Sequence, residues 1–117
     1  MIDDLKRGEI VLVNLDPARG SESKKTRPCL VVQNDTGNQF SPLTIIVIIT
    51  SQKDIHKKYP TDVWVDEGEG GLDKPSIIQC DQIRTIDKNR IIKRFGLLDI
   101  SRMMEVDQAI KISLDLI

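Results

Sequence analysis

One stretch decides how this chain folds: Gly20-Ser21-Glu22-Ser23-Lys24-Lys25-Thr26-Arg27-Pro28-Cys29-Leu30-Val31-Val32-Gln33-Asn34-Asp35. It opens as a polar loop and ends as an apolar run rich in β-branched residues, which predicts a buried strand. Pro28 fits the first residue of that strand, where its missing N–H disturbs no ladder. The stretch therefore places Arg27 at the mouth of a strand. From the residues alone it is either a functional loop or a hairpin loop whose charges only keep it soluble.

The composition predicts one domain over residues 1–117, of ordinary globular character. The chain is 39% hydrophobic and 30% charged, with 3% aromatic residues, so we expect an aliphatic core. A formal net charge of −1 does not fit a general duplex-DNA binder, which is usually strongly basic. Contact with nucleic acid would depend on a local patch such as Lys24, Lys25 and Arg27.

The cysteines and the N-terminus predict a cytoplasmic protein. Met1-Ile2-Asp3-Asp4 is acidic and no apolar run follows it, so we expect no signal peptide. Cys29 and Cys80 both lie in apolar, strand-like runs, which predicts two buried free thiols in a reducing compartment, with a disulfide as the alternative. No run approaches the length of a membrane span, and no membrane association is expected.

Several apolar segments are typical of strands. They cover residues 9–15, the run ending at Gln33, and residues 44–50, 61–66, 76–84 and 91–98. The run 44–50 is the most apolar and predicts a central strand buried on both faces. Residues 34–42 read as a second loop, because Gly37, Asn38 and Pro42 are breakers, with Phe40 anchoring it to the core.

The C-terminal segment predicts a helix. Asp99 can cap it, and the apolar residues follow at helical spacing: Met103, Val106, Ile110, Leu114 and Ile117. Strands and helix do not alternate as βαβ units, which argues against a parallel doubly wound sheet. The fold class predicted is mainly β (α+β), a small curved antiparallel barrel with a C-terminal helix.

The chain offers little for metal or histidine chemistry. His56 is the sole histidine and the two cysteines are far apart in the sequence, so no zinc cluster is expected. Carboxylates such as Asp16, Asp35 and Asp81 would bind magnesium only if the fold gathered them. We therefore expect neither a metal nor another cofactor. A nuclease that uses two imidazoles within one chain is excluded.

A series of short motifs occurs in a fixed order along the chain. They are Arg7-Gly8-Glu9-Ile10, Asp16-Pro17, Gly20-Ser21-Glu22, Thr26-Arg27-Pro28, Val32-Gln33-Asn34-Asp35, Asn38, Ser41-Pro42, Ile49-Thr50-Ser51 and Asp81-Gln82-Ile83-Arg84-Thr85-Ile86-Asp87. The ordered set resembles the MazF/PemK family of bacterial toxin endoribonucleases over nearly the whole chain. No single tripeptide is specific for that family.

The resemblance implies an SH3-like barrel, a homodimer and sequence-specific, metal-independent cleavage of single-stranded RNA, mainly mRNA. It implies a partner antitoxin similar to MazE, and products ending in a 2′,3′-cyclic phosphate and a 5′-hydroxyl. It carries the family's catalytic Arg–Thr pair onto Arg27 and Thr50. Guanidinium suits the charged phosphorane because it can grip two phosphate oxygens.

The general base stays open between Glu22 and Asp81. Some relatives use His at the Ser21 position and Arg at the Gln79 position, so that arrangement is absent here. Asp81 would then either remove the proton or read a base. The residues expected to bind RNA are Gly20, Ser21, Asn34, Gln79 and Gln82. The alternative function is a toxin of the same fold that poisons DNA gyrase by binding, without catalysis.

Overall fold

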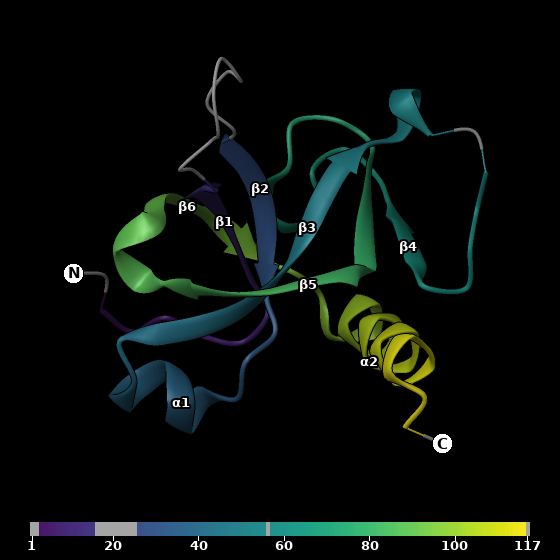
Figure 1. Cartoon of the computed structure of the whole chain (residues 1–117). Coiled ribbons are helices and arrows are strands. Elements are labelled where there is room, and N and C mark those ends of the chain that lie inside the picture. The colour runs from purple at the N-terminus through teal and green to yellow at the C-terminus, as the bar shows by residue number, and fades with distance from the viewer. Residues whose placement is uncertain (1–2, 16–25, 56, 117) are drawn as a thin grey trace, which may run out of the picture.

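The computed structural model describes residues 3–15, 26–55 and 57–116 of the chain. Its strands are β1 (Glu9–Asn14), β2 (Thr26–Val31), β3 (Leu43–Ser51), β4 (Asp62–Val65), β5 (Ser76–Asp87) and β6 (Ile91–Leu97). Two α-helices, α1 (Asp35–Phe40) and α2 (Ile100–Leu114), and three 3₁₀ turns, η1 (Gln52–Asp54), η2 (Glu69–Gly71) and η3 (Lys88–Arg90), complete it (Figure 1).

All six strands form one antiparallel sheet in the order β4-β5-β3-β2-β1-β6, which confirms the predicted fold class. The sheet curls without closing, because β4 and β6 are its two edges within the described residues. Turn η2, which follows β4, packs against β6 instead. A Cβ added at Gly71 (φ +81°) would lie 2.6 Å from the carbonyl oxygen of Phe95, so only glycine permits this approach.

The two faces of the sheet bury separate apolar clusters, because side chains alternate along each strand. Ile10, Leu30, Val47, Ile49 and Ile78 pack on one face beneath Val106 and Ala109 of helix α2. On the other face lie Val11, Val13, Cys29, Val31, Ile46 and Ile86. We call this second face the site face, since it carries the residues discussed below. The run predicted as a central strand is β3, paired with β2 and β5.

Helix α2 begins as the sequence predicts, with the carboxylate of Asp99 accepting from the backbone N–H of Ser101 at 3.0 Å. Its apolar stripe is buried only in part. Val106 is buried and Met103 and Ile110 pack against the core, but Leu114 is 53% exposed. No helix within the described ranges is long and apolar enough to cross a membrane.

Residues 34–42 contain helix α1, so the prediction of a simple loop is wrong. Asn34 caps it, its Oδ1 accepting from the N–H of Gly37 at 2.7 Å. The buried Asn38 side chain accepts from Thr44 Oγ1 at 2.7 Å and donates to the Gln33 carbonyl at 2.9 Å. These side-chain bonds hold a helix that is too short to be stable alone.

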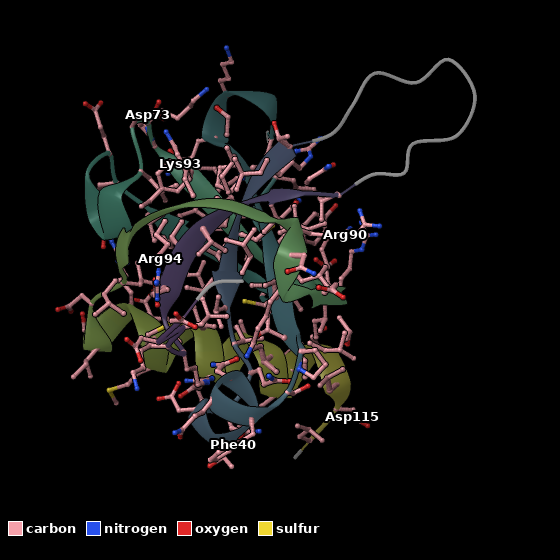
Figure 2. All side chains as sticks on the ribbon, turned by 90° about the vertical axis from the view of Figure 1, so that its left-hand side faces the viewer. Phe40, Asp73, Arg90, Lys93, Arg94 and Asp115 are labelled. Atoms are coloured by element: carbon pink, nitrogen blue, oxygen red, sulfur yellow. The ribbon has the colours of Figure 1, made fainter. Side chains whose placement is uncertain are left out.

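Phe40 does not anchor this segment, contrary to expectation. Its side chain is 76% exposed and lies at the outer end of α1 (Figure 2). Instead, the buried Lys88 of η3 donates a hydrogen bond from Nζ to the carbonyl oxygen of Asn38. A lysine at the C-terminal end of α1 satisfies a carbonyl that has no partner within the helix.

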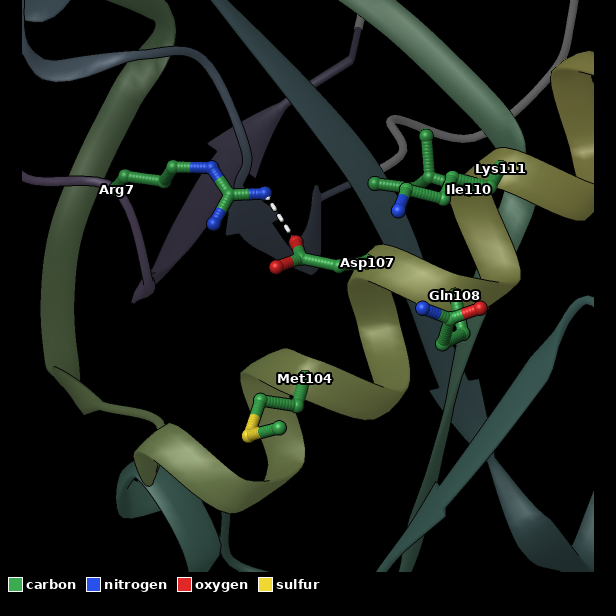
Figure 3. A pocket seen from close by; sticks show the side chains of 6 residues that line it. All are labelled: Arg7, Met104, Asp107, Gln108, Ile110 and Lys111. Carbon is green, nitrogen blue, oxygen red and sulfur yellow. Dashed lines mark hydrogen bonds and ion pairs between the residues drawn. The ribbon is translucent and has the colours of Figure 1, made fainter. Parts of the chain in front are cut away.

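Arg7 joins the N-terminal segment to helix α2. Its Nη2 lies 2.6 Å from Asp107 Oδ1, and its Nε donates to the carbonyl oxygen of Val32 at 2.8 Å. Figure 3 shows this pair across an open pocket that Met104, Gln108, Ile110 and Lys111 also line. The backbone N–H of Arg7 also donates to Asp35 Oδ1 at 2.7 Å. Arg7 thus fixes α1, the end of β2 and α2 relative to one another.

Candidate active site

Arg27 and Thr50 lie at the same end of the sheet, where β2 begins and β3 ends (Figure 1). The described pairing of β2 with β3 runs from Val31↔Ile46 to Cys29↔Ile48. Extending this register by two residues places Arg27 opposite Thr50, just beyond the last described pair. The two residues predicted to be catalytic therefore lie at one end of the sheet, beyond the last described pair of β2 and β3.

Pro28 is the third residue of β2, so its predicted place at the start of the strand is wrong by two positions. Its Cα partner is Leu12 of β1, whereas the described pairing with β3 begins only at Cys29. A residue without an N–H is tolerated here because one side of β2 is unpaired at this point. The proline thereby marks where β2 and β3 separate and the site begins.

The side chains of Arg27 and Thr50 point to the site face. Arg27 alternates in phase with Cys29, and Thr50 with Ile48, and both of those residues belong to the cluster on that face. Both Arg27 and Thr50 are half-buried. Among the described residues, the guanidinium of Arg27 makes no hydrogen bond or ion pair. A half-buried guanidinium beside a hydroxyl is suited to hold a phosphate.

Gln79 joins them on the site face, as predicted for an RNA-binding residue. It is half-buried in β5 and lies opposite Ile48. The next pair along the two strands is Val47↔Ile83, so three residues of β5 have no counterpart in β3. Strand β5 bends there, as Figure 1 shows. The bulge contains Cys80, which is buried, and Asp81 and Gln82, which are exposed.

The remaining predicted site residues lie elsewhere. Asn34 caps α1 at the opposite end of β2 from Arg27, so in one subunit the structure does not bring it to the Arg27–Thr50 pair. Gly20, Ser21 and Glu22 lie outside the described residues, as do Lys24 and Lys25 of the predicted basic patch. Of the two candidate bases, only Asp81 can therefore be located, at the bend of β5 rather than beside Thr50.

The two cysteines are free and buried, as predicted. Burial raises the pKa of the Cys29 thiol to about 12, although the nearby charges of Arg84 and Arg27 act to lower it. Burial also raises the pKa of Cys80 to about 12, and the carboxylates of Asp62, Asp81 and Asp107 raise it further. Thiols held protonated in this way are poor nucleophiles, so neither cysteine is a candidate catalytic group.

Two charged residues of the site face, Asp62 and Arg84, are missing from the predicted set of site residues. Asp62 of edge strand β4 lies opposite Gln79, and its carboxylate accepts from the N–H of Tyr59 at 3.1 Å. Arg84 of β5 lies opposite Ile46 and is exposed. Counting alternate residues back from the buried Ile86 would have placed Arg84 on this face. The sequence does not show where Arg84 lies relative to Arg27, because that depends on the bulge in β5.

No group of three or more His, Cys, Asp and Glu side chains is gathered for a metal ion within residues 3–15, 26–55 and 57–116.

Residues 6–114 match the family described as the PemK-like, MazF-like toxin of type II toxin–antitoxin systems. The chain belongs to this family. The resemblance seen in the sequence is thus confirmed over nearly the full length.

Two relatives and one solved structure illustrate the similarity to the MazF-like family. The chain is 46% identical over 114 residues to "Endoribonuclease EndoA" of Bacillus subtilis (strain 168), covering 97% of each chain. It is 44% identical over 113 residues to "Endoribonuclease MazF" of Staphylococcus saprophyticus, covering 96% of this chain and 92% of the relative. A MazE–MazF crystal structure from Deinococcus radiodurans superposes with a TM-score of 0.78, at 23% identity and 97% coverage of each chain, and supports the same fold.

Proposed function

We propose that this protein is a toxin endoribonuclease that cleaves single-stranded RNA, chiefly mRNA, at specific sequences. Membership of the MazF-like family and 46% identity to an endoribonuclease over nearly the whole chain support an RNA-cleaving toxin. The observation that carries the proposal is that Arg27 and Thr50 point to one face at the same end of the sheet, where β2 begins and β3 ends. Neither residue is needed for the core, and together they suit a phosphate.

The proposed reaction uses the RNA's own 2′-hydroxyl as the nucleophile. Its oxygen attacks the neighbouring phosphorus, the bond from phosphorus to the 5′ oxygen breaks, and a 2′,3′-cyclic phosphate and a 5′-hydroxyl result. Arg27 stabilises the charged phosphorane and Thr50 donates a hydrogen bond to the same phosphate. A base removes the 2′ proton and an acid protonates the leaving oxygen. Glu22 and Asp81 remain the two candidates for the base.

We assign base and backbone recognition to residues around this pair. Gln79 lies on the same face and Gln82 at the exposed bend of β5. Their amides can donate and accept, which reading base edges requires. Gly20 and Ser21 complete the proposed RNA-binding set. Asn34 belongs to it only if a second subunit brings α1 to the groove, since within one subunit it caps that helix at the far end.

A cleavage assay tests the function against the gyrase alternative. Purified protein is incubated with labelled RNA in excess EDTA, and in parallel with gyrase and supercoiled DNA. We expect RNA cleavage without added metal and no effect on gyrase, since an intramolecular nucleophile needs no metal-bound water. Intact RNA together with inhibited gyrase would contradict the proposal.

We further propose that the protein is a homodimer whose groove accepts RNA or a MazE-like antitoxin. The similarity to the MazE–MazF crystal structure from Deinococcus radiodurans supports such an antitoxin for this chain. Exposed apolar side chains support the dimer, since a monomer rarely exposes so many together. They include Leu97, Ile100, Met104, Ile112 and Leu114. Light scattering at micromolar concentration should give twice the mass of the chain, and a fully active monomer would refute this.

The cytoplasm is the proposed location, and two observations are consistent with it. Cys29 and Cys80 are free thiols, which are usual in a reducing compartment. The substrate we propose, mRNA, is also found there. Fractionation of cells that express a tagged protein should recover it with the cytosolic markers, and recovery in the membrane or secreted fraction would contradict the assignment.

A further inference from the structure

Arg84 is a cation on the site face that has no bonded partner among the described residues. It lies opposite Ile46 in the pairing of β3 with β5, and Ile46 is fully buried in the cluster of that face. Its neighbour Ile83 packs against the cluster on the opposite face, so Arg84 must point to the site face. Arg84 is exposed, and within the described part of the chain its guanidinium has no hydrogen bond or ion pair.

Arg84 and Arg27 lie on β5 and β2, the two strands that flank β3, and the charges of both act on the Cys29 thiol. The positive charge of Arg84 and, to a smaller extent, that of Arg27 act to lower the pKa of the Cys29 thiol. Burial has the larger effect and raises that pKa. The carboxylates of the neighbouring region, Asp62 and Asp81, instead act on Cys80. Neither arginine is neutralised by a bonded carboxylate within the described residues, so a polyanion bound along this face would meet two cations.

We propose that Arg84 binds a second RNA phosphate on the site face, further along the strand from the one that Arg27 contacts during cleavage. The inference rests on the proposed function, since it names a further contact of the same RNA. A guanidinium can grip two phosphate oxygens, and a contact with a phosphate is independent of the base. Arg84 therefore fixes the path of the strand, while Gln79, on the same face, is free to read a base. Two anchored phosphates hold the stretch of RNA between them in position for attack.

A merely structural role for Arg84 predicts a different outcome. Arg94 and Arg102, by comparison, bond to Glu9 and Glu69, so their loss would unfold local structure. Arg84 has no such bond to lose. We therefore expect Arg84→Gln to keep the melting temperature of the free protein while weakening its binding of RNA. Lys111→Gln is the matched control, because Lys111 is exposed on α2, on the other side of the sheet.

The test measures affinity for an RNA that carries a 2′-deoxyribose at the cleavage position, so that it is bound and not cut. We expect Arg84→Gln to bind about tenfold more weakly than the parent, as for loss of a charged hydrogen bond. The slope of log affinity against log salt concentration should fall by about 0.7, the value for one phosphate on a single strand. Lys111→Gln should match the parent in both respects.

Replacing single phosphates by neutral methylphosphonates then locates the contact. At one position other than the cleaved phosphate, the replacement should weaken RNA binding by the parent and leave binding by Arg84→Gln unaffected. If the parent cleaves RNA and Arg84→Gln binds RNA as tightly as Lys111→Gln does, this inference alone is overturned. A parent that neither binds nor cleaves RNA would overturn the proposed function, and this inference with it. A lower melting temperature with an unchanged salt slope would show a structural role and also overturn it.

Discussion

Arg27→Ala is expected to lower the rate of RNA cleavage by about a hundred- to a thousand-fold, the usual effect of removing one preorganised donor from a developing oxyanion. The fold should survive, because the guanidinium makes no hydrogen bond or ion pair to the described part of the protein. Single-turnover rates on one RNA check the loss of activity, and the melting temperature checks that the fold survives. Toxicity in cells should be lost together with activity.

Two companion variants sharpen the Arg27 prediction. Arg27→Lys should recover little of the rate, because an ammonium is a point charge and cannot make the two-pronged contact with phosphate. Lys111→Ala removes an exposed positive charge from α2 and should behave like the parent. If Arg27→Ala cuts RNA at the parent rate, Arg27 is only a surface charge, and the proposed chemistry fails at its central residue.

Thr50→Val is expected to have the next largest effect. Valine keeps the shape of the side chain and removes its hydroxyl. Thr50 offers one neutral donor to the charged phosphate, whereas Arg27 offers a charged fork, so the rate should fall less, roughly ten- to thirtyfold. RNA affinity should be nearly unchanged, the pattern of an interaction made mainly in the transition state. An unchanged rate would show that the Arg27–Thr50 assignment is wrong for this chain.

Asp81→Asn, measured on the same set of RNAs, separates the two roles left open for Asp81. If Asp81 reads a base, sequence preference should relax while cleavage at some sites survives. If it is the general base, cleavage should be lost at every site. The exposed position of Asp81 in the bulge of β5 favours the reading role, since nothing in the described chain holds it beside Thr50. Loss of cleavage at every site would contradict that assignment and would identify Asp81, rather than Glu22, as the base.

Much of the fold could be predicted because apolar, β-branched runs specify strands locally. The run 44–50 and the Asp99 cap both appear as expected. Helix α1 could not be predicted in this way. Its segment contains Gly37 and has weak helix propensity, and it is held by side-chain bonds that Asn38 makes to Gln33 and Thr44. Such bonds form only once the strands on both sides are in place.

The site was predicted less completely. Arg27 and Thr50 could be chosen from their motifs, but their proximity depends on the register of β2 and β3, which no local pattern reveals. The bulge of β5 likewise separates Asp81 and Gln82 from Gln79 although the three are close in sequence. Arg84 belongs to one of the motifs in the sequence, but only the fold shows that it lies on the same face as Arg27. Tertiary pairing therefore determines which polar residues of β5 can act together.

The most direct test of the account compares two RNAs that differ in one atom. Both contain the mapped cleavage site, and one lacks the 2′-oxygen of the nucleotide before the cleaved bond. The account predicts that in excess EDTA the all-ribose RNA is cut, leaving a 2′,3′-cyclic phosphate by mass, while the deoxy RNA stays intact. Cleavage of the deoxy RNA at the same bond, or cleavage of the ribose RNA only after a divalent metal is added, would contradict it.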